Sequence, residues 1–360
     1  MSRSLEAGIQ AQYKYQTVHY SQFNTPPAAP LILVSRPWAF MRGELERKMR
    51  ASRGDRRKSW QAALEYSMLA EQFYDAASRA KFPVNATLYY YGMLNLAKTL
   101  ICARGKLLGG NQEQHGLILG EPGKGKVEVL GRSTAVTSIF YEFARSIGTP
   151  VTRRQSFDLV EVISHIPEMH ELAFHSGVLS GSKRAFLPIT IDVLVSKNRQ
   201  WLFSEMRYQK KHEVRVAHNR FYSGSRKRYF RAGFERDGCV VFRSKFRKRI
   251  SKDNWPRIYA NLRREYEDFN LASILTRDGY RYYCDLGAPG FHHLCYSIML
   301  CFYVGAVARY RPSEVATVLA RGPNHAVVQE AIENVPIQFL YQMTGHITDS
   351  VCVIPYSSIA

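Results

Sequence analysis

The chain has 360 residues, with 50 Lys and Arg against 30 Asp and Glu, and a formal net charge of +20. Hydrophobic residues make up 46% of the sequence and aromatic residues 12%, which is enough to bury a sizeable core and excludes a disordered basic tail or a low-complexity scaffold. At about 150 residues per domain, this length predicts two modules or one core with a large insertion.

The first third of the chain predicts a lead-in followed by helices. Residues 1–35 are polar and then Pro-rich, and we expect them to be an extended lead-in whose Leu-Ile-Leu-Val run forms a short strand or a docking arm. Residues 84–105 form a second helix behind Pro83, and we expect it to pack antiparallel against the helix before it. In that preceding helix, the apolar residues at helical spacing, which we expect to face the core, are Trp60, Ala63, Leu64, Met68, Phe73 and Ala76.

Residues 111–285 read as a mixed α/β insert. Its Gly120–Lys126 segment fits the GxxxxGK pattern of phosphate-binding loops, but Val127 stands where a Ser or Thr would bind magnesium, and a strand-like sequence follows. We therefore predict a hairpin turn there. The later strand-like runs, rich in β-branched and aromatic residues, are 185–195, 199–209 and 238–244.

The last part of the chain, 286–350, is again helical. The uncharged run Leu294–Ala308 has 15 residues, short of the roughly 20 that cross a bilayer, and predicts a buried core helix. We expect segments 36–110 and 286–350 to close into one helical bundle, which gives an α+β, mainly helical fold. The six cysteines show no CxxC pair and the amino terminus lacks a secretory apolar stretch, so we expect a cytoplasmic protein with no membrane partner.

Most of the positive charge lies in one stretch, 207–264, which holds 19 Lys and Arg against four acidic residues and forms the basic lobe of the predicted insert. Aromatic residues alternate with these cations, and cations bind phosphates while aromatic rings stack on unpaired bases, so we expect a nucleic-acid surface. A solvated basic face or a dock for an acidic protein is the alternative. The candidate phosphate-binding residues are Lys210, Lys211, Arg215, Arg220, Arg226, Lys227, Arg228, Arg231, Arg243, Lys245, Arg247, Lys248 and Arg249.

Catalytic candidates lie in the C-terminal helices. Arg309 and Arg311 stand at a helix junction before Pro312, with His325 beyond, and such a set could bind a scissile phosphate and move a proton. Equally, both arginines could pair with the last carbonyls of their helix. No cluster of metal ligands and no cofactor motif is present, so we expect neither a metal nor a cofactor.

Two further groups of polar residues attract attention. Asn95 and Lys98 lie on an otherwise apolar helix, where a partly buried lysine needs a partner, and His115 begins the following hairpin. His292 and His293 open the apolar C-terminal helix, and we expect a capping role rather than metal binding.

Three blocks of sequence carry a family resemblance: Tyr89–Lys98, His115–Leu117, and His292, His293 and Tyr296 with Ala308–Pro312. In this order they resemble the YaaC-like family of bacterial proteins, over about residues 57–345. The family has no settled activity, so the resemblance implies no reaction. Its paired helices are also similar to HEPN-type bundles, which include RNA-binding modules, ribonucleases and phage-defence proteins.

The sequence thus predicts an intracellular protein that grips the phosphate backbone of nucleic acid through its basic lobe, in phage defence or nucleic-acid processing. A HEPN-like, metal-independent ribonuclease is one alternative, and a non-catalytic subunit that docks on an acidic protein is another. The choice between DNA and RNA, and the oligomeric state, stay open.

Overall fold

The computed structural model describes residues 7–108, 113–132, 136–180, 185–215, 222, 225–245, 247–251, 253–287, 289–315 and 323–355. The fold is α+β, as predicted, and the chain divides into two compact units. The strand unit comprises 1–32, 185–288 and 349–351; the helical unit comprises 33–184, 289–348 and 352–360.

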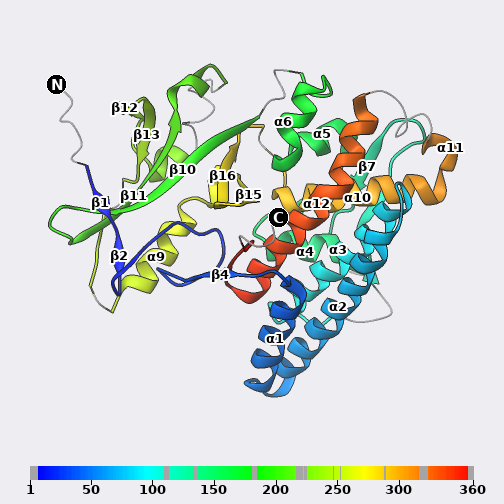
Figure 1. The fold of residues 1–360 in the computed structure, drawn as a ribbon, viewed down its shortest axis with the longest axis horizontal. Helices are drawn as coiled ribbons and strands as arrows, with labels where there is room; N and C mark the ends of the chain where they lie inside the picture. The colour runs from blue at the N-terminus through cyan, green and yellow to red at the C-terminus, as the bar shows by residue number, and fades with distance from the viewer. Residues whose placement is uncertain are drawn as a thin grey trace. The chain divides into compact units, whose positions relative to one another are not determined.

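The helical unit is built on long helices, in which α3 (Val84–Ala103) packs against α2, α12 and α10 (His293–Tyr310) (Figure 1). Nearly all of α10, from His293 to Val307, is buried, which confirms the predicted core helix. Among the described residues, no helix has both the length and the apolar character needed to cross a bilayer. The helices of this unit are α1 (Pro37–Arg50), α2 (Gly54–Arg79), α3 (Val84–Ala103), α4 (Ile139–Ser146), α5 (Leu159–Ser164), α6 (Pro167–His175), α10 (His293–Tyr310), α11 (Pro312–Glu314) and α12 (Pro323–Thr348).

Helices α2 and α3 pack side by side, as the sequence predicts, and the predicted core face of α2 is confirmed at Trp60 and Ala63, which are buried. Met68 is 45% exposed, and the buried positions past Ala63 are small residues and Tyr74. A Cβ atom at Gly92 of α3 would lie 2.5 Å from the Tyr74 ring, so the glycine admits this close approach. The prediction was wrong at Met68 and Ala76, which are exposed, because small side chains one position away lie where the two helices come closest.

Residues 113–180 join the helical unit, so the insert is divided between the two units rather than forming one lobe. The reason is packing: Phe140, Phe143 and Ile163 enter the same core as α3 and α10. The predicted hairpin is confirmed, because β6 pairs antiparallel with β7 across the Gly120–Lys126 segment. The short strands of this region are β5 (Glu113–Gln114), β6 (Leu117–Leu119), β7 (Lys126–Val129), β8 (Thr137–Ser138) and β9 (Gln155–Asp158).

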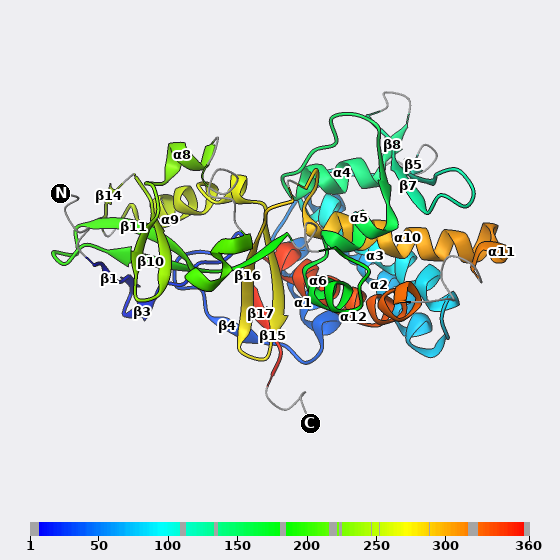
Figure 2. The same ribbon diagram turned by 90° about the horizontal axis from the view of Figure 1, so that it is seen from above.

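The strand unit is an antiparallel sheet in the order β12-β13-β11-β10-β16-β15. Figure 2 labels β10, β11, β15 and β16 of this sheet. Helix α9 (Trp255–Arg264) buries Trp255, Ile258 and Leu262 in its core. The strands are β10 (Phe186–Val195), β11 (Trp201–Gln209), β12 (Phe234–Arg236), β13 (Cys239–Arg243), β14 (Lys248–Arg249), β15 (Leu271–Thr276) and β16 (Gly279–Asp285), with the short helices η3 (Lys210–Arg215), α8 (Ser225–Tyr229) and η4 (Glu267–Phe269).

Residues 7–32, which the sequence predicts to be part of an extended lead-in, belong to the strand unit. Ala11, Val18 and Phe23 are completely buried, and Arg263 of α9 donates hydrogen bonds to the Phe23 carbonyl and to Asn24. The predicted strand in the Leu-Ile-Leu-Val run is confirmed as β4, which pairs with β17. The strands outside the main path are β1 (Ile9–Gln10), β2 (Gln12–Tyr13), β3 (Gln16–Thr17), β4 (Leu31–Leu33) and β17 (Val351–Val353). Of these, β1 pairs with β10.

Candidate functional site

The cationic segments 225–231 and 243–249 lie next to each other in the strand unit. Phe230 forms a β-bridge with Ser244, the Lys245 amide donates to the Tyr229 carbonyl at 2.7 Å, and the Arg231 amide donates to the Arg243 carbonyl at 2.9 Å. The two densest clusters of the sequence are therefore joined by backbone hydrogen bonds.

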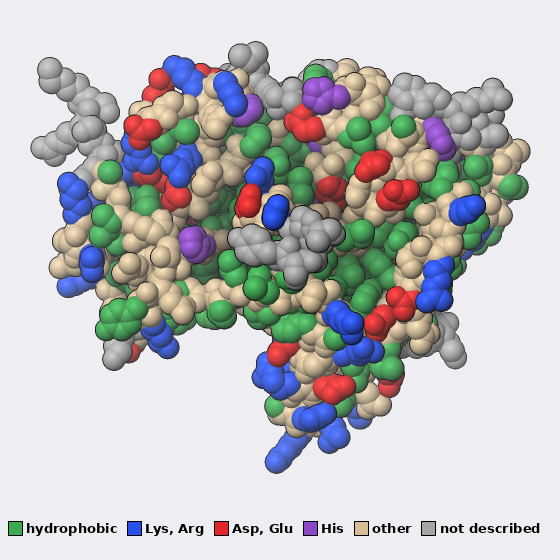
Figure 3. All heavy atoms as spheres, viewed as in Figure 1, with side chains coloured by type: hydrophobic (Ala, Val, Ile, Leu, Met, Phe, Trp, Pro, Cys, Tyr) green, Lys and Arg blue, Asp and Glu red, His purple; other side chains and the backbone are tan. Residues whose placement is uncertain are grey.

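Four side chains on these segments form what we call the basic patch: Lys227, Arg228, Lys245 and Arg247. All four are exposed, and no carboxylate of the described residues lies within 4.0 Å of their charged atoms. Lys227 lies 5.7 Å from the Tyr222 ring centre, and Arg228 lies 5.7 Å from that of Tyr229. In Figure 3, many Lys and Arg side chains stand at the surface of the strand unit, with some acidic ones between them.

Two predicted phosphate ligands are not on this surface. Arg243 is 1% exposed, and its Nη2 lies 2.5 Å from Oε1 of Glu205, which is completely buried. Arg226 is 9% exposed and lies over the Phe269 ring. The prediction was wrong for both because a β-strand and a helical turn each point some of their side chains into the core, whatever the local charge density.

The other predicted cations have varied surroundings. Lys210 pairs with Glu235, and the half-buried Lys248 pairs with Glu265 at 2.9 Å. Lys211, Arg231 and Arg249 are exposed. Arg220 and the Arg215 side chain lie outside the described residues.

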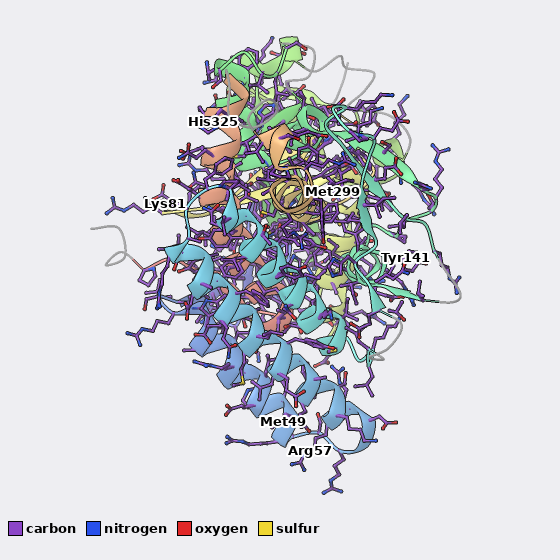
Figure 4. All side chains as sticks on the ribbon, turned by 90° about the vertical axis from the view of Figure 1, so that its right-hand side faces the viewer. Met49, Arg57, Lys81, Tyr141, Met299 and His325 are labelled. Carbon is purple, nitrogen blue, oxygen red and sulfur yellow. The ribbon has the colours of Figure 1, made fainter. Side chains whose placement is uncertain are left out.

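The three catalytic candidates have different neighbours. Arg309 contacts Tyr91, Arg311 donates to the Gly120 carbonyl at 2.7 Å, and the His325 ring lies 5.7 Å from that of Phe82. Figure 4 shows His325 near the start of α12, toward the same end of the helical unit as Lys81 and away from Met49 and Arg57. The histidine that lies in the electrostatic field of Arg309 is His115.

We call the group formed by Tyr91, Lys98, Glu113, His115 and Arg309 the polar cluster. Lys98 lies 2.6 Å from Glu113, and only 19% and 13% of their side chains are exposed. Glu113 is therefore the partner that a partly buried lysine needs. Arg309 donates to the Tyr91 hydroxyl at 2.7 Å, and the Tyr91 ring is 5.9 Å from that of His115. The cluster thus joins α3, β5, the segment after β5 and α10.

The close packing of α10 on α3 explains this meeting. A Cβ at Gly305 would lie 2.8 Å from the Thr87 Cα, so only glycine allows the two backbones to approach this far. Thr87 donates its hydroxyl hydrogen to the Gly305 carbonyl at 3.1 Å. One turn later, Arg309 is held against α3.

His115 is electrostatically perturbed. Burial, followed by the positive charges of Arg309 and Lys98, lowers the pKa of His115 below its usual value. The ring is therefore neutral near pH 7, with its nitrogens available as one donor and one acceptor. Asn95, by contrast, donates to the Tyr91 carbonyl of its own helix and has a structural role.

A second group of histidines lies at the start of α10. His292 caps the helix, because its Nδ1 accepts from the Leu294 amide at 3.3 Å, and this confirms the predicted capping role. The buried His293 lies 2.9 Å from Gln342, and its ring is 4.2 Å from that of His292. His346 of α12 lies 6.2 Å from His292. Among the described residues, no group of three metal-ligand side chains is placed to hold an ion.

Comparison with known proteins agrees with the sequence blocks that meet in these two groups. The family model of the YaaC-like proteins matches residues 22–347, most of the chain. The chain belongs to the YaaC-like family. No curated protein and no solved structure matches it.

In this YaaC-like protein, the sequence pointed to part of each group and missed the rest. Lys98, His115 and Arg309 were all in the blocks, but Glu113 and His346 were not singled out. Glu113 lies two residues before His115, and the unpaired charge of Lys98 was the signal that an acid had to be near. His346 gave no local signal, because it reaches His292 only through the packing of α12 on the rest of the unit.

We expect acid to destabilise the YaaC-like protein through His346. Burial, then the charge of Arg104 and the neighbouring His293, lowers the pKa of His346 to about 3, and burial lowers that of His292 well below its usual range. A histidine that is neutral when folded contributes its full stability above its ordinary pKa and loses it as the pH falls toward the folded value. For His346, this loss is ~2 kcal/mol between about pH 7 and about pH 5.

Thermal unfolding of the full chain over this pH range measures the effect. The His346→Gln variant should show a flatter fall in melting temperature with acid than the native protein. The matched control is His175→Gln, because His175 is 72% exposed and should leave the slope unchanged. Equal slopes for all three proteins would contradict the prediction.

Proposed function

We propose that this protein binds nucleic acid through the basic patch of its strand unit. The observation that carries the proposal is the set of four exposed cations, Lys227, Arg228, Lys245 and Arg247, which have no carboxylate partner among the described residues and lie on two segments joined by hydrogen bonds. Cations left without acidic neighbours on a folded surface are suited to neutralise phosphates and release counterions.

The composition of the patch favours the nucleic-acid backbone over base edges. Arginine offers a planar fork to phosphate oxygens and lysine a point charge, and neither selects a sequence by such contacts. The same sheet carries an aromatic side chain, Trp201, which is 36% exposed and pairs in register with the exposed Arg249. A partly exposed indole opposite an arginine supports stacking on an unpaired base. We therefore expect single strands to bind at least as tightly as duplex DNA.

The experiment is a binding titration of the purified protein, freed of copurifying nucleic acid, with labelled single-stranded RNA, single-stranded DNA and duplex DNA over a series of salt concentrations. The expected result is binding whose logarithm falls linearly with the logarithm of salt, with a slope of roughly −0.7 to −0.9 per phosphate contacted. Absence of binding to all three probes at low salt would refute the proposal and would direct the search to an acidic protein partner.

The same gels test the ribonuclease alternative. We also propose, by analogy of fold, that the helical unit is a HEPN-like bundle. A shortened probe that persists in EDTA, and disappears in the His325→Ala variant, would favour metal-independent cleavage that uses the predicted Arg309, Arg311 and His325. Intact probes would leave binding as the function.

We further propose that the protein is cytoplasmic and acts in phage defence or nucleic-acid processing. All six cysteines are free, which is the usual state in a reducing compartment.

A further inference from the structure

The polar cluster of the helical unit has hydrogen-bond donors that the protein itself does not use. Arg309 donates its Nε hydrogen to the Gly305 carbonyl at 3.2 Å and one Nη1 hydrogen to the Tyr91 hydroxyl. A guanidinium has five N–H donors, and the other three have no hydrogen-bond acceptor among the described residues. No carboxylate within that part of the chain pairs with Arg309, although Lys98 in the same cluster has Glu113.

A buried hydroxyl beside the cluster is also unsatisfied. Tyr90 is completely buried, and its hydroxyl has no hydrogen-bond partner among the described residues. Its ring lies 5.6 Å from that of His115 and 5.4 Å from that of Tyr91. A buried polar group without a partner costs about 1–3 kcal/mol, and a ligand that accepts a hydrogen bond removes this cost.

We propose that the polar cluster binds the phosphate group of a small phosphomonoester, with Arg309, Lys98 and His115 as its ligands. The site lies in the helical unit and is independent of the nucleic-acid binding proposed for the strand unit. Arg309 supplies a fork of N–H donors, Lys98 a point charge, and His115 a ring that can take up a proton.

Charge balance favours a phosphate over a carboxylate. With His115 neutral, Lys98, Glu113 and Arg309 together carry one net positive charge, which a carboxylate would already neutralise. A phosphomonoester carries about −1.5 to −2 at pH 7, so it leaves a negative charge that protonation of His115 balances. Binding of phosphate is therefore coupled to uptake of about one proton, and binding of a carboxylate is not.

Among the groups that face it, His115 is the residue that takes up the proton. These groups are Tyr90, Tyr91 and Lys98 from α3, Arg309 from α10, and, around Lys98 and Tyr90, Glu113 from β5, Tyr66 from α2 and Tyr310 from α10. Burial raises the pKa of Tyr66 to about 12 and raises that of Tyr90, so these phenols stay neutral. Burial and the two cations set the low pKa of His115, and a bound dianion would raise it.

Isothermal titration calorimetry on the full chain tests the proposal. The probes are inorganic phosphate, adenosine monophosphate and acetate, each titrated near neutral pH in two buffers that differ in ionisation enthalpy, so that proton uptake is read directly. We expect both phosphate probes to bind with proton uptake and acetate to bind weakly without it. Tighter binding of the nucleotide identifies an ester as the ligand, and equal binding identifies free phosphate.

The variants separate the roles of the three ligands. Arg309→Gln should weaken phosphate binding by ~10–100-fold, the cost of a lost charge-assisted hydrogen bond. His115→Gln should abolish the proton uptake. Because Lys98→Met would leave Glu113 without its partner, the Lys98→Met, Glu113→Gln double variant tests the lysine with the pair removed together. Melting temperatures show that each variant is folded.

Two exposed residues of the same unit provide control variants for phosphate binding. Arg79→Gln and His175→Gln change exposed residues of the same unit and should bind like the native protein. A variant with the basic patch removed should keep phosphate binding, so failure of one proposal does not affect the other. The proposal is overturned if neither phosphate probe binds, if acetate binds as tightly with the same proton uptake, or if Arg309→Gln binds like the native protein.

Discussion

Replacing Lys227, Arg228, Lys245 and Arg247 together by alanine is expected to lower the affinity for nucleic acid by ~100-fold at low salt, and to reduce the steepness of the salt dependence by about three. Each of these exposed side chains gives up a phosphate contact and the counterions it displaces. Because none pairs with a carboxylate among the described residues, their removal leaves no buried or unpaired acid behind. The variant loses only exposed contacts, such as that of Lys245 with the Lys227 carbonyl, so we expect it to remain folded.

The control for this variant removes the same charge elsewhere. Arg57, Arg79, Lys81 and Lys126 are exposed on the helical unit, pair with no carboxylate of the described residues and are likewise two lysines and two arginines. If net charge alone governs binding, their replacement by alanine lowers affinity equally, and the patch has no special role. Arg226 is kept in both variants, because it is only 9% exposed and its loss would disturb packing rather than binding.

The second large effect is on stability. Glu205 is completely buried in the sheet, and it pairs with the buried Arg243 and, through its other oxygen, with Arg236. Glu205→Gln leaves the Arg243 guanidinium without its counter-charge in the core of the strand unit. The free energy of unfolding should fall by ~3–5 kcal/mol, the usual cost of removing one partner of a buried ion pair.

Urea unfolding of the full chain, followed by circular dichroism and tryptophan fluorescence, measures this loss. The matched control is Glu235→Gln, because Glu235 is 63% exposed in its pair with Lys210 and should change stability by less than about 1 kcal/mol. Replacing Glu205 by Leu and Arg243 by Met together should recover most of the loss. A Glu205→Gln variant as stable as Glu235→Gln would show that the buried pair contributes little.

The basic patch and Arg243 lie in the same basic segment of the sequence. Charge density marks 207–264 as unusual, and four of its cations form an exposed patch. The same charge density led to the prediction that Arg243 binds phosphate. Arg243 instead neutralises the carboxylate of Glu205, which lies 38 residues away in the chain. Local composition reports how many cations are present, but pairing across a sheet decides which of them solvent can reach.

The polar cluster is a similar case. The sequence singled out Lys98, His115 and Arg309 separately, and grouped Arg309 with Arg311 and His325 because they are close in the chain. Arg309 instead contacts Tyr91, 218 residues away, because Gly305 lets α10 approach α3. A contact of this kind depends on the angle and distance between two helices, which no local pattern encodes.

By itself, then, the sequence determined the elements whose signals are local. These include the α+β class, the buried helix α10, the antiparallel pair of α2 and α3, the hairpin of β6 and β7, the cap at His292 and the family. Helical periodicity, turn residues and apolar runs act within a few residues of each other, so these could be predicted. The tertiary structure alone decided that residues 7–32 enter the strand unit, that 113–180 enter the helical unit, and which polar side chains meet. Those outcomes depend on side-chain packing and charge pairing between distant segments, whose energies exist only once the elements are assembled.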